Sequence, residues 1–322
     1  YVDDILCFTK NPRDHLQTLR QVLEKLRKAG LRANPEKSIF LTKSLDYLGA
    51  EISADSITYS KDKATKIAAM SPPDSMRQLQ KTLGMFNYGS KFIFHYAKKV
   101  YPLQQLVRSQ ASWSGGPLPP RALFAFHRIR AELAARPKLG YILPHRALHL
   151  YIDASMTESK QDGKGFGAVL LQDTPGEVRR PVAYLSRSLR RHELNYPAGL
   201  AEIKAATWAI RRLEPHLKAR KTFALYCQHR DLLNRMRDLN AHHRKTLAHC
   251  HDTLDNYLVV WKPLPYAGVA IADFLSHYHG VPVGEPKRPG EKGIREMAAN
   301  AALVSHVASN PLGGDDPQPR IR

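Results

Sequence analysis

Two adjacent acids, Asp3 and Asp4, lie between apolar, β-prone residues in the opening stretch Tyr-Val-Asp-Asp-Ile-Leu-Cys-Phe. Asp favours turns, so residues 1–8 predict a tight hairpin with both carboxylates at its tip. Adjacent carboxylates repel each other unless a cation or a turn compensates. Phosphodiester chemistry commonly uses a pair of divalent cations, and Mg²⁺ prefers carboxylate and water oxygens. The pair is therefore either an ordinary surface turn or part of a site for Mg²⁺ (or Mn²⁺).

A third acid in a distinctive place is Asp153, which ends the alternating, strand-like run that begins at Leu148. Further strands and one long helix are predicted after it, over 165–172, 181–185, 197–213 (the helix), 222–227 and 257–262. A short helix is predicted over 270–278. Strands, then a helix, then further strands and a terminal helix predict a domain of the α/β (α+β) class, with a mixed sheet flanked by helices.

In the first half of the chain the spacing of apolar residues follows a different pattern. Asn11 and Pro12 predict the start of a helix that ends at Gly30. A β-prone pair of segments covers 38–59, on either side of a turn at Tyr47-Leu48-Gly49. From 61 to 108 the apolar period is helical and is broken only around Pro72 and Pro73. One predicted helix there carries the apolar stripe Met76, Leu79, Leu83 and Phe86. A loop over 112–120 and a helix over 121–135 follow.

The charge of the chain is unusual for its ordinary hydrophobic content. Lys and Arg number 49 against 29 Asp and Glu, a net charge of +20 over 322 residues. Such an excess favours a polyanionic partner, although a basic protein without a nucleic-acid role is the alternative. Three scattered cysteines, no apolar run long enough for a membrane span and no signal peptide predict an intracellular protein without a disulfide framework.

Several motifs resemble the Pol proteins of gypsy-like LTR retrotransposons. The first group resembles the reverse-transcriptase palm and primer grip: Tyr-Val-Asp-Asp, Ala29-Gly30-Leu31, Asn34-Pro35-Glu36-Lys37 and Leu45-Asp46-Tyr47-Leu48-Gly49. The second resembles the family's thumb: Pro73, Leu79 through Tyr88, Phe92-Ile93 and Pro102-Leu103. The third resembles its ribonuclease H: Tyr151 through Ser155, 165–172, 183–189, Asn195-Tyr196, Ala201-Glu202, Trp208-Ala209 and Ala272 through Ser276. The motifs keep one order over roughly 1–280.

This resemblance implies ribonuclease H metal ligands at Asp153, Glu202 and Asp273, and palm ligands at Asp3 and Asp4. It also implies an RNA–DNA hybrid as the substrate. Each acid alone is more often a surface residue, and the contexts of a strand end, a helix and the start of a last helix favour the shared site.

The family pattern fails at two places. The family has a metal-binding Asp after its fourth ribonuclease H strand, where this chain has Gln228. An amide oxygen still contacts Mg²⁺ but carries no charge, so we expect weak or absent cleavage of a hybrid. The palm has another metal-binding Asp and the fingers upstream of Tyr-Val-Asp-Asp, and this chain starts at Tyr1 without Met. We therefore expect a truncated Pol product that does not polymerise DNA.

Basic residues near the expected nuclease site include Arg187, Arg190 and Arg191, and the family places Lys37 near an incoming nucleotide. A surface that follows phosphates of a hybrid is the functional interpretation, and a solvated charged face is the alternative. A group rich in histidine fits a solvated basic helix better than a zinc site, because its spacing matches no standard finger: His242, His243, His249, Cys250 and His251.

The sequence therefore predicts a segment of a larger Pol polyprotein, with five parts. These are a partial palm (1–60), a helical thumb (61–110), a connector (111–146), a ribonuclease-H-like domain (147–280) and a tail (281–322). Any surviving activity is expected to be metal-dependent cleavage of RNA in a hybrid. The alternatives are a non-catalytic basic module that binds nucleic acid and an inert retroelement relic.

Overall fold

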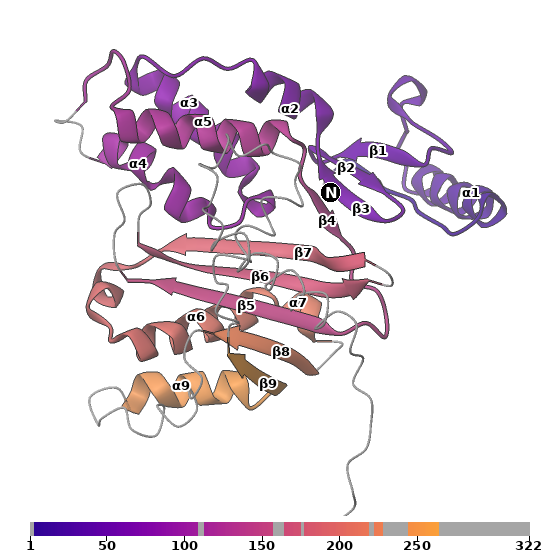
Figure 1. Cartoon of the computed structure of the whole chain (residues 1–322). Coiled ribbons are helices and arrows are strands. Elements are labelled where there is room, and N and C mark those ends of the chain that lie inside the picture. Colours follow the sequence, from indigo (N-terminus) through magenta and orange to yellow (C-terminus); the bar gives the residue numbers. More distant parts are fainter. Residues whose placement is uncertain are drawn as a thin grey trace, which may run out of the picture.

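The computed structural model describes residues 3–108, 113–156, 164–174, 177–218, 222–227 and 244–263. In Figure 1 a group of helices lies above a long-stranded sheet, and a smaller sheet and a projecting helix lie to the right. The predicted helix over 270–278, Asp273 and Gln228 lie outside the described residues.

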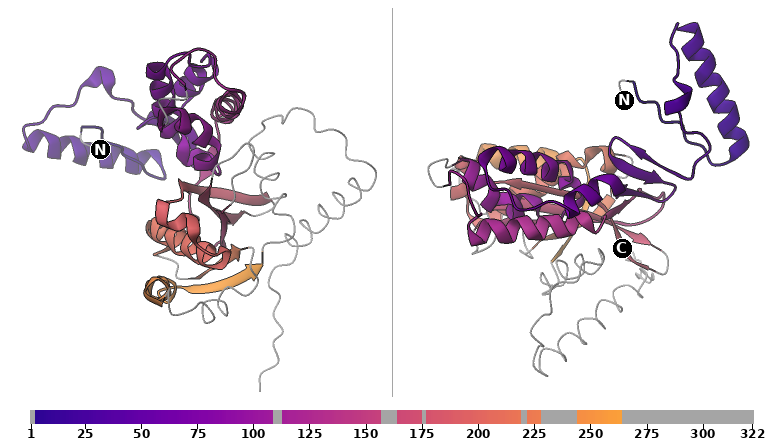
Figure 2. Two further views of the ribbon diagram at one scale, coloured as in Figure 1. Left: turned by 90° about the vertical axis from the view of Figure 1, so that its left-hand side faces the viewer. Right: turned by 90° about the horizontal axis from the view of Figure 1, so that it is seen from above.

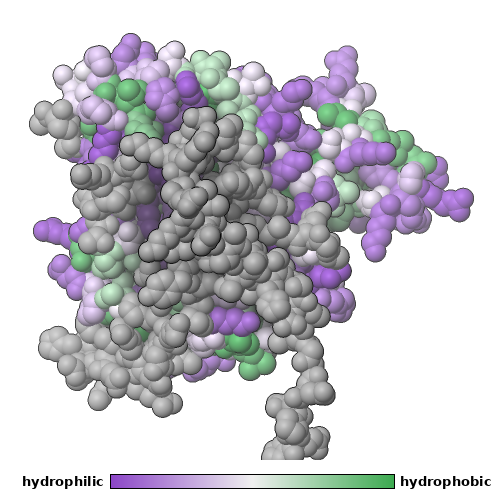
Figure 3. Space-filling view, in the orientation of Figure 1, coloured by the Kyte–Doolittle hydropathy of each residue, from purple (hydrophilic) through white to green (hydrophobic). Residues whose placement is uncertain are grey.

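Helix α1 (Pro12–Lys28) projects from the rest of the molecule (Figure 2). Its start is as predicted, since the Asn11 side chain accepts a hydrogen bond of 2.9 Å from the Asp14 backbone. No residue of α1 is buried, and its apolar side chains Leu16 and Leu23 are exposed. Figure 3 shows hydrophobic (green) patches among hydrophilic (purple) ones on the projecting part at the right. The predicted hairpin over 1–8 is wrong for the described residues, because none from Asp3 to Phe8 is in a strand. Two very short strands without a third partner are too weak to hold a hairpin.

The first sheet is antiparallel with the order β1-β2-β3-β4: Ser44–Tyr47, Ala50–Ser53, Ser56–Tyr59 and Lys138–Gly140. The predicted turn at its first hairpin is present, because Leu48 and Gly49 both have positive φ, 47° and 70°. Two positive φ values in a two-residue turn match the right-handed twist of the flanking strands. Strand β4 was not predicted, and it closes the sheet far along the chain from β3.

Between β3 and β4 lie four helices, called here the helical unit: α2 (Lys61–Ala68), α3 (Met76–Tyr88), α4 (Tyr96–Arg108) and α5 (Pro120–Ala134). The predicted stripe is confirmed in α3, where Leu79 and Phe86 are fully buried. They pack with Phe126 of α5 in one core, and the Phe86 and Phe126 rings are 5.8 Å apart.

The second sheet is mixed and has the order β7-β6-β5-β8-β9. Its strands are β5 (Leu148–Ser155), β6 (Gly165–Thr174), β7 (Glu177–Ser188), β8 (Thr222–Cys227) and β9 (Leu258–Pro263). The first three pair antiparallel, and β8 and β9 continue parallel to β5. Helices α6 (Ala198–Arg212) and α9 (Arg244–Leu254) share a core with the sheet. The predicted fold class is confirmed.

Strand β5 lies at the centre of this sheet and separates two environments. Leu148, Leu150 and Ile152 pack in one core with α6, whereas Tyr151 belongs to the core of the helical unit. Because side chains alternate along a strand, Asp153 shares the face of Tyr151. The helical unit lies above β7 in Figure 1. Val169 of β6 and Tyr184 of β7 share its core with Tyr151, so the helical unit approaches the Asp153 face of the sheet. Among the helices of the described residues, none has the length and apolarity to cross a membrane.

Candidate functional site

The Asp153 carboxylate contacts the helical unit. It lies near the end of β5, paired with Gly167 of β6, and its side chain is 33% exposed. The Lys98 ammonium of α4 donates a hydrogen bond to Asp153 Oδ2, and His95 Nε2 lies 3.4 Å from the same oxygen. Lys98 is therefore the counter-ion of Asp153, the acid that the sequence predicts as a metal ligand.

Backbone contacts hold the start of α4 at this place. The Ala97 backbone donates to Ser186 Oγ of β7 at 2.9 Å. Gly167 leaves room for the His95 ring, since a Cβ at that position would overlap the imidazole. Burial above all, and then the charges of Lys98, Lys99 and Arg128, hold the pKa of His95 well below its usual value. His95 is therefore neutral, and Lys98 supplies the positive charge beside Asp153.

Glu202 lies on α6, and its side chain is 5% exposed. Helix α6 packs against Leu148, Leu150 and Ile152 of β5. Within the described ranges no three His, Cys, Asp or Glu side chains are grouped so as to share a metal ion. While Lys98 is paired with the carboxylate, the surroundings of Asp153 do not fit a divalent cation.

The residues expected at the polymerase site, Asp3, Asp4 and Lys37, lie outside both sheets. Asp3 and Asp4 are exposed, and the Tyr47 hydroxyl of β1 donates to the Asp4 backbone oxygen at 3.3 Å. Lys37 is exposed in a short 3₁₀ helix, Pro35–Lys37.

Arg187 is engaged within the protein. Its two terminal nitrogens each donate to one oxygen of Glu193 at 2.6 Å, and its guanidinium lies over the rings of Phe166 and Trp208 at 4.5 and 5.4 Å. Burial works to raise the pKa of Glu193, but the hydrogen bonds from Arg187 and from the Arg190 backbone outweigh it and lower the pKa. These contacts form what is called here the Arg187–Glu193 clamp.

Other arginines near Arg187 in the sequence, called here the basic block, divide into bound side chains (Arg179, Arg180) and exposed ones (Arg190, Arg191). Arg179 donates to Asp173 at 2.9 Å and to the Tyr151 hydroxyl at 2.6 Å, and Arg180 donates to the Asp55 backbone oxygen at 2.6 Å. Arg190 and Arg191 are exposed at the start of the 3₁₀ helix Arg191–Asn195. Those two are the residues of the block, among the predicted contacts, whose side chains reach solvent.

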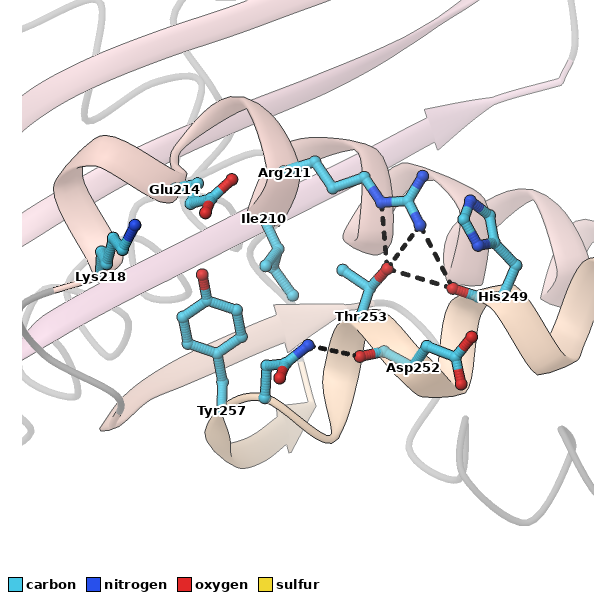
Figure 4. Close-up of a pocket in the computed structure, with 9 residues that line it drawn as sticks. Ile210, Arg211, Glu214, Lys218, His249, Asp252, Thr253 and Tyr257 are labelled. Atoms are coloured by element: carbon cyan, nitrogen blue, oxygen red, sulfur yellow. Dashed lines mark hydrogen bonds between the residues drawn. The ribbon is translucent and has the colours of Figure 1, made fainter.

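A pocket of about 510 Å³ lies between the C-terminal ends of α6 and α9 (Figure 4). Arg211 donates to Thr253 Oγ1 at 2.8 and 3.0 Å, and Asn256 donates to the Asp252 backbone oxygen at 2.7 Å. The Arg211 bonds join α6 to α9, whereas the Asn256 bond is local to the end of α9. The pocket contains none of the predicted site residues.

Sequence reasoning missed the most consequential neighbour of Asp153. Lys98 was not singled out, and the visible signal was a pair of lysines, Lys98 and Lys99, next to the buried Val100 in an apolar helix. Lysine is almost never fully buried without a partner, so a lysine at a buried position of a helix predicts an acid nearby.

These features define a reverse-transcriptase type of protein with a ribonuclease-H-like domain. Residues 144–257 match the family described as the RNase H-like domain found in reverse transcriptase, and residues 1–52 match the reverse transcriptase (RNA-dependent DNA polymerase) family. The chain belongs to the Pol proteins of LTR retrotransposons, which confirms the resemblance seen in its motifs.

Two relatives illustrate this membership. The retrovirus-related Pol polyprotein from transposon opus of Drosophila melanogaster is 36% identical over 240 residues, which cover 72% of this chain and 23% of that protein. The transposon Tf2-3 polyprotein of Schizosaccharomyces pombe is 27% identical over 277 residues, 86% of this chain and 20% of that protein. The chain thus spans about a quarter or less of the length of these relatives.

Solved structures show the same fold. The foamy viral protease–reverse transcriptase in complex with an RNA/DNA hybrid aligns with a TM-score of 0.64 at 19% identity, over 80% of this chain and 34% of that one. The same viral protein in complex with double-stranded DNA aligns with a TM-score of 0.61 at 17% identity, over 80% and 52%.

Proposed function

We propose that this segment of Pol binds nucleic acid and that any hydrolysis it performs is metal-dependent cleavage of the RNA strand of an RNA–DNA hybrid. The observation that carries the proposal is the place of Asp153 near the end of the central strand of a ribonuclease-H-like sheet. The relatives and the fold support the same reading.

The proposed ligands of Mg²⁺ or Mn²⁺ are Asp153, Glu202 and Asp273, with Gln228 as a neutral residue at a position for an acid. A bound divalent cation would activate water and stabilise the leaving oxygen. In the described arrangement the Asp153 carboxylate is held by Lys98, so the site requires its release. Gln228 removes one negative charge, and both features predict weak cleavage.

Nucleic acid is proposed to lie along exposed basic side chains. Arg190 and Arg191 are exposed beside the ribonuclease-H-like sheet, and Lys37 is exposed beside the first sheet. Arg187 supports this surface through its clamp to Glu193. The net charge of +20 makes phosphate contacts and a strong dependence on salt the expected mode of binding.

The proposed division of the chain follows the five parts predicted from the sequence: 1–60 as palm, 61–110 as thumb, 111–146 as connector, 147–280 as ribonuclease-H-like domain and 281–322 as tail. Asp3 and Asp4 are proposed palm ligands.

A second candidate function is a non-catalytic clamp on nucleic acid. The Lys98–Asp153 ion pair favours it, because that pair neutralises the carboxylate on which hydrolysis would depend.

Cleavage of a labelled RNA–DNA hybrid by the full chain, in Mg²⁺ and in Mn²⁺, separates the two functions. Asp153→Asn is the negative control and Gln228→Asp restores the acid of the family. Cleavage that Asp153→Asn abolishes and Gln228→Asp strengthens supports the nuclease. No cleavage by either the unaltered chain or Gln228→Asp, with binding that weakens steeply as salt rises, refutes the nuclease and leaves the clamp.

A further inference from the structure

Two neighbouring lysines of α4 have different partners. Lys99 Nζ lies 2.7 Å from both carboxylate oxygens of Glu132 on α5, within the helical unit. Lys98, whose side chain is 9% exposed, instead pairs with Asp153 of the ribonuclease-H-like sheet, 55 residues away in the sequence. One ion pair therefore stabilises the helical unit, and the other joins the helical unit to the sheet.

The fold holds Lys98 at this place. The Ala97 backbone binds Ser186 of β7, and the absence of a side chain at Gly167 lets the His95 ring sit against β6. Lys98 follows directly, so its ammonium enters the space beside Asp153 Oδ2. His95 Nε2, 3.4 Å from the same oxygen, fills a further part of that space.

We propose that Lys98 is a built-in cation that competes with a divalent metal ion for Asp153, so that contact between the helical unit and the sheet closes the site. An ammonium and a dication around one carboxylate oxygen repel each other strongly where water is scarce. An ion therefore binds only after Lys98 withdraws, and docking of α4 weakens ion binding. This inference rests on the proposed function, because it takes Asp153 as a metal ligand.

The test is Mn²⁺ binding to the full chain, measured by the loss of the free-ion signal in electron paramagnetic resonance. Lys98→Met removes the competing charge and is expected to tighten binding about tenfold or more, which corresponds to about 1.4 kcal/mol. Lys99→Met is the matched control, since it breaks an ion pair of the same helix without touching Asp153, and is expected to leave the affinity within about twofold. Asp153→Asn is expected to weaken binding, and Lys98→Met in that background to give no gain.

The outcomes separate the two claims. If Asp153→Asn weakens binding but Lys98→Met does not tighten it, the competition is refuted and Asp153 remains a metal ligand. If Asp153→Asn leaves binding unchanged, or neither the unaltered chain nor Lys98→Met binds Mn²⁺, the metal site at Asp153 is refuted and the competition with it.

A measurement on the unaltered chain removes any dependence on how the variants fold. Amine acylation followed by mass spectrometry compares the reactivity of Lys98 with that of Lys99 as an internal reference. Saturating Mn²⁺ is expected to raise the Lys98-to-Lys99 ratio severalfold, because the withdrawn ammonium is exposed. An unchanged ratio with Mn²⁺ bound would overturn the proposal.

Discussion

Replacing Glu193 by Gln tests the Arg187–Glu193 clamp. The Glu193 side chain is only 6% exposed and accepts two hydrogen bonds of 2.6 Å from Arg187 and one of 2.7 Å from the Arg190 backbone. Hydrogen bonds to charged groups contribute about 1.5–3 kcal/mol each, and an amide retains one acceptor oxygen. The Arg187 guanidinium then loses its counter-ion while still held over Phe166. We expect Glu193→Gln to lower the free energy of unfolding by about 2–4 kcal/mol at neutral pH.

The pH dependence of the free energy of unfolding identifies the cause of this loss. The pKa of Glu193 is lower in the folded chain than its usual value of 4.5. Its contribution is therefore fully present above the unfolded-state pKa and is lost as the pH falls through the lower, folded-state pKa. Since Gln does not titrate, the stabilities of the two proteins should differ by a constant amount above about pH 5 and converge in more acidic solution.

Urea unfolding followed by far-ultraviolet circular dichroism, repeated from neutral to acidic pH, measures this difference. The matched control is Asp62→Asn, which breaks an ion pair of 2.7 Å with Lys66 whose side chains are 65% exposed. That exposed pair is expected to change stability by no more than about 0.5 kcal/mol. A Glu193→Gln effect as small as the control, or one that persists unchanged in acid, would refute the assignment of the stability to the ionised clamp.

Three further predictions follow from the same contacts. Phe126→Ala empties the fully buried centre of the helical unit and should cost about 3–5 kcal/mol in urea unfolding; a loss under about 1 kcal/mol would contradict that packing. Gly49→Ala forces a side chain onto a φ of 70° and should lower stability by about 1–2 kcal/mol, measured by thermal unfolding. Arg190→Ala combined with Arg191→Ala should reduce the slope of log affinity for a hybrid against log salt by about 2 in a fluorescence-anisotropy titration, and an unchanged slope would remove both from the nucleic-acid surface.

Local rules predicted much of the fold. The cap at Asn11 and the hairpin turn at Gly49 are present because each depends on neighbours within a few residues. The strands and the helix from Leu148 onward are present where their apolar patterns predicted them. The hairpin over 1–8 was wrong, since β-prone residues form strands only when further strands pair with them. Strand β4 is three residues long, which is too short to show the alternation of apolar and polar residues that predicts a strand.

The candidate site was predictable only in part. The motif and the strand end identified Asp153, but nothing local assigns its partner. The partner lies on a helix 55 residues earlier, and the contact depends on how the helical unit meets the sheet. Arg187 shows the same limit: its charge predicted a phosphate contact, whereas Glu193 lies within reach only after the 3₁₀ helix has folded back on β7. Asp153, Glu202, Asp273 and Gln228 remain predictions as a ligand set.

The position of Asp153 would link two properties of the chain, docking of the helical unit on the sheet and binding of a divalent ion. If the same carboxylate stabilises docking of the helical unit and binds a divalent ion, each event weakens the other by the same free energy, because coupling between two binding equilibria is reciprocal. A substitution that strengthens docking at β7 should then lower metal affinity without touching a ligand. Conversely, a nucleic acid that pulls α4 away from the sheet would free Asp153 for the ion. If this proposal holds, Gln228 alone does not decide whether this Pol segment hydrolyses RNA, because Lys98 at the interface also controls the availability of Asp153.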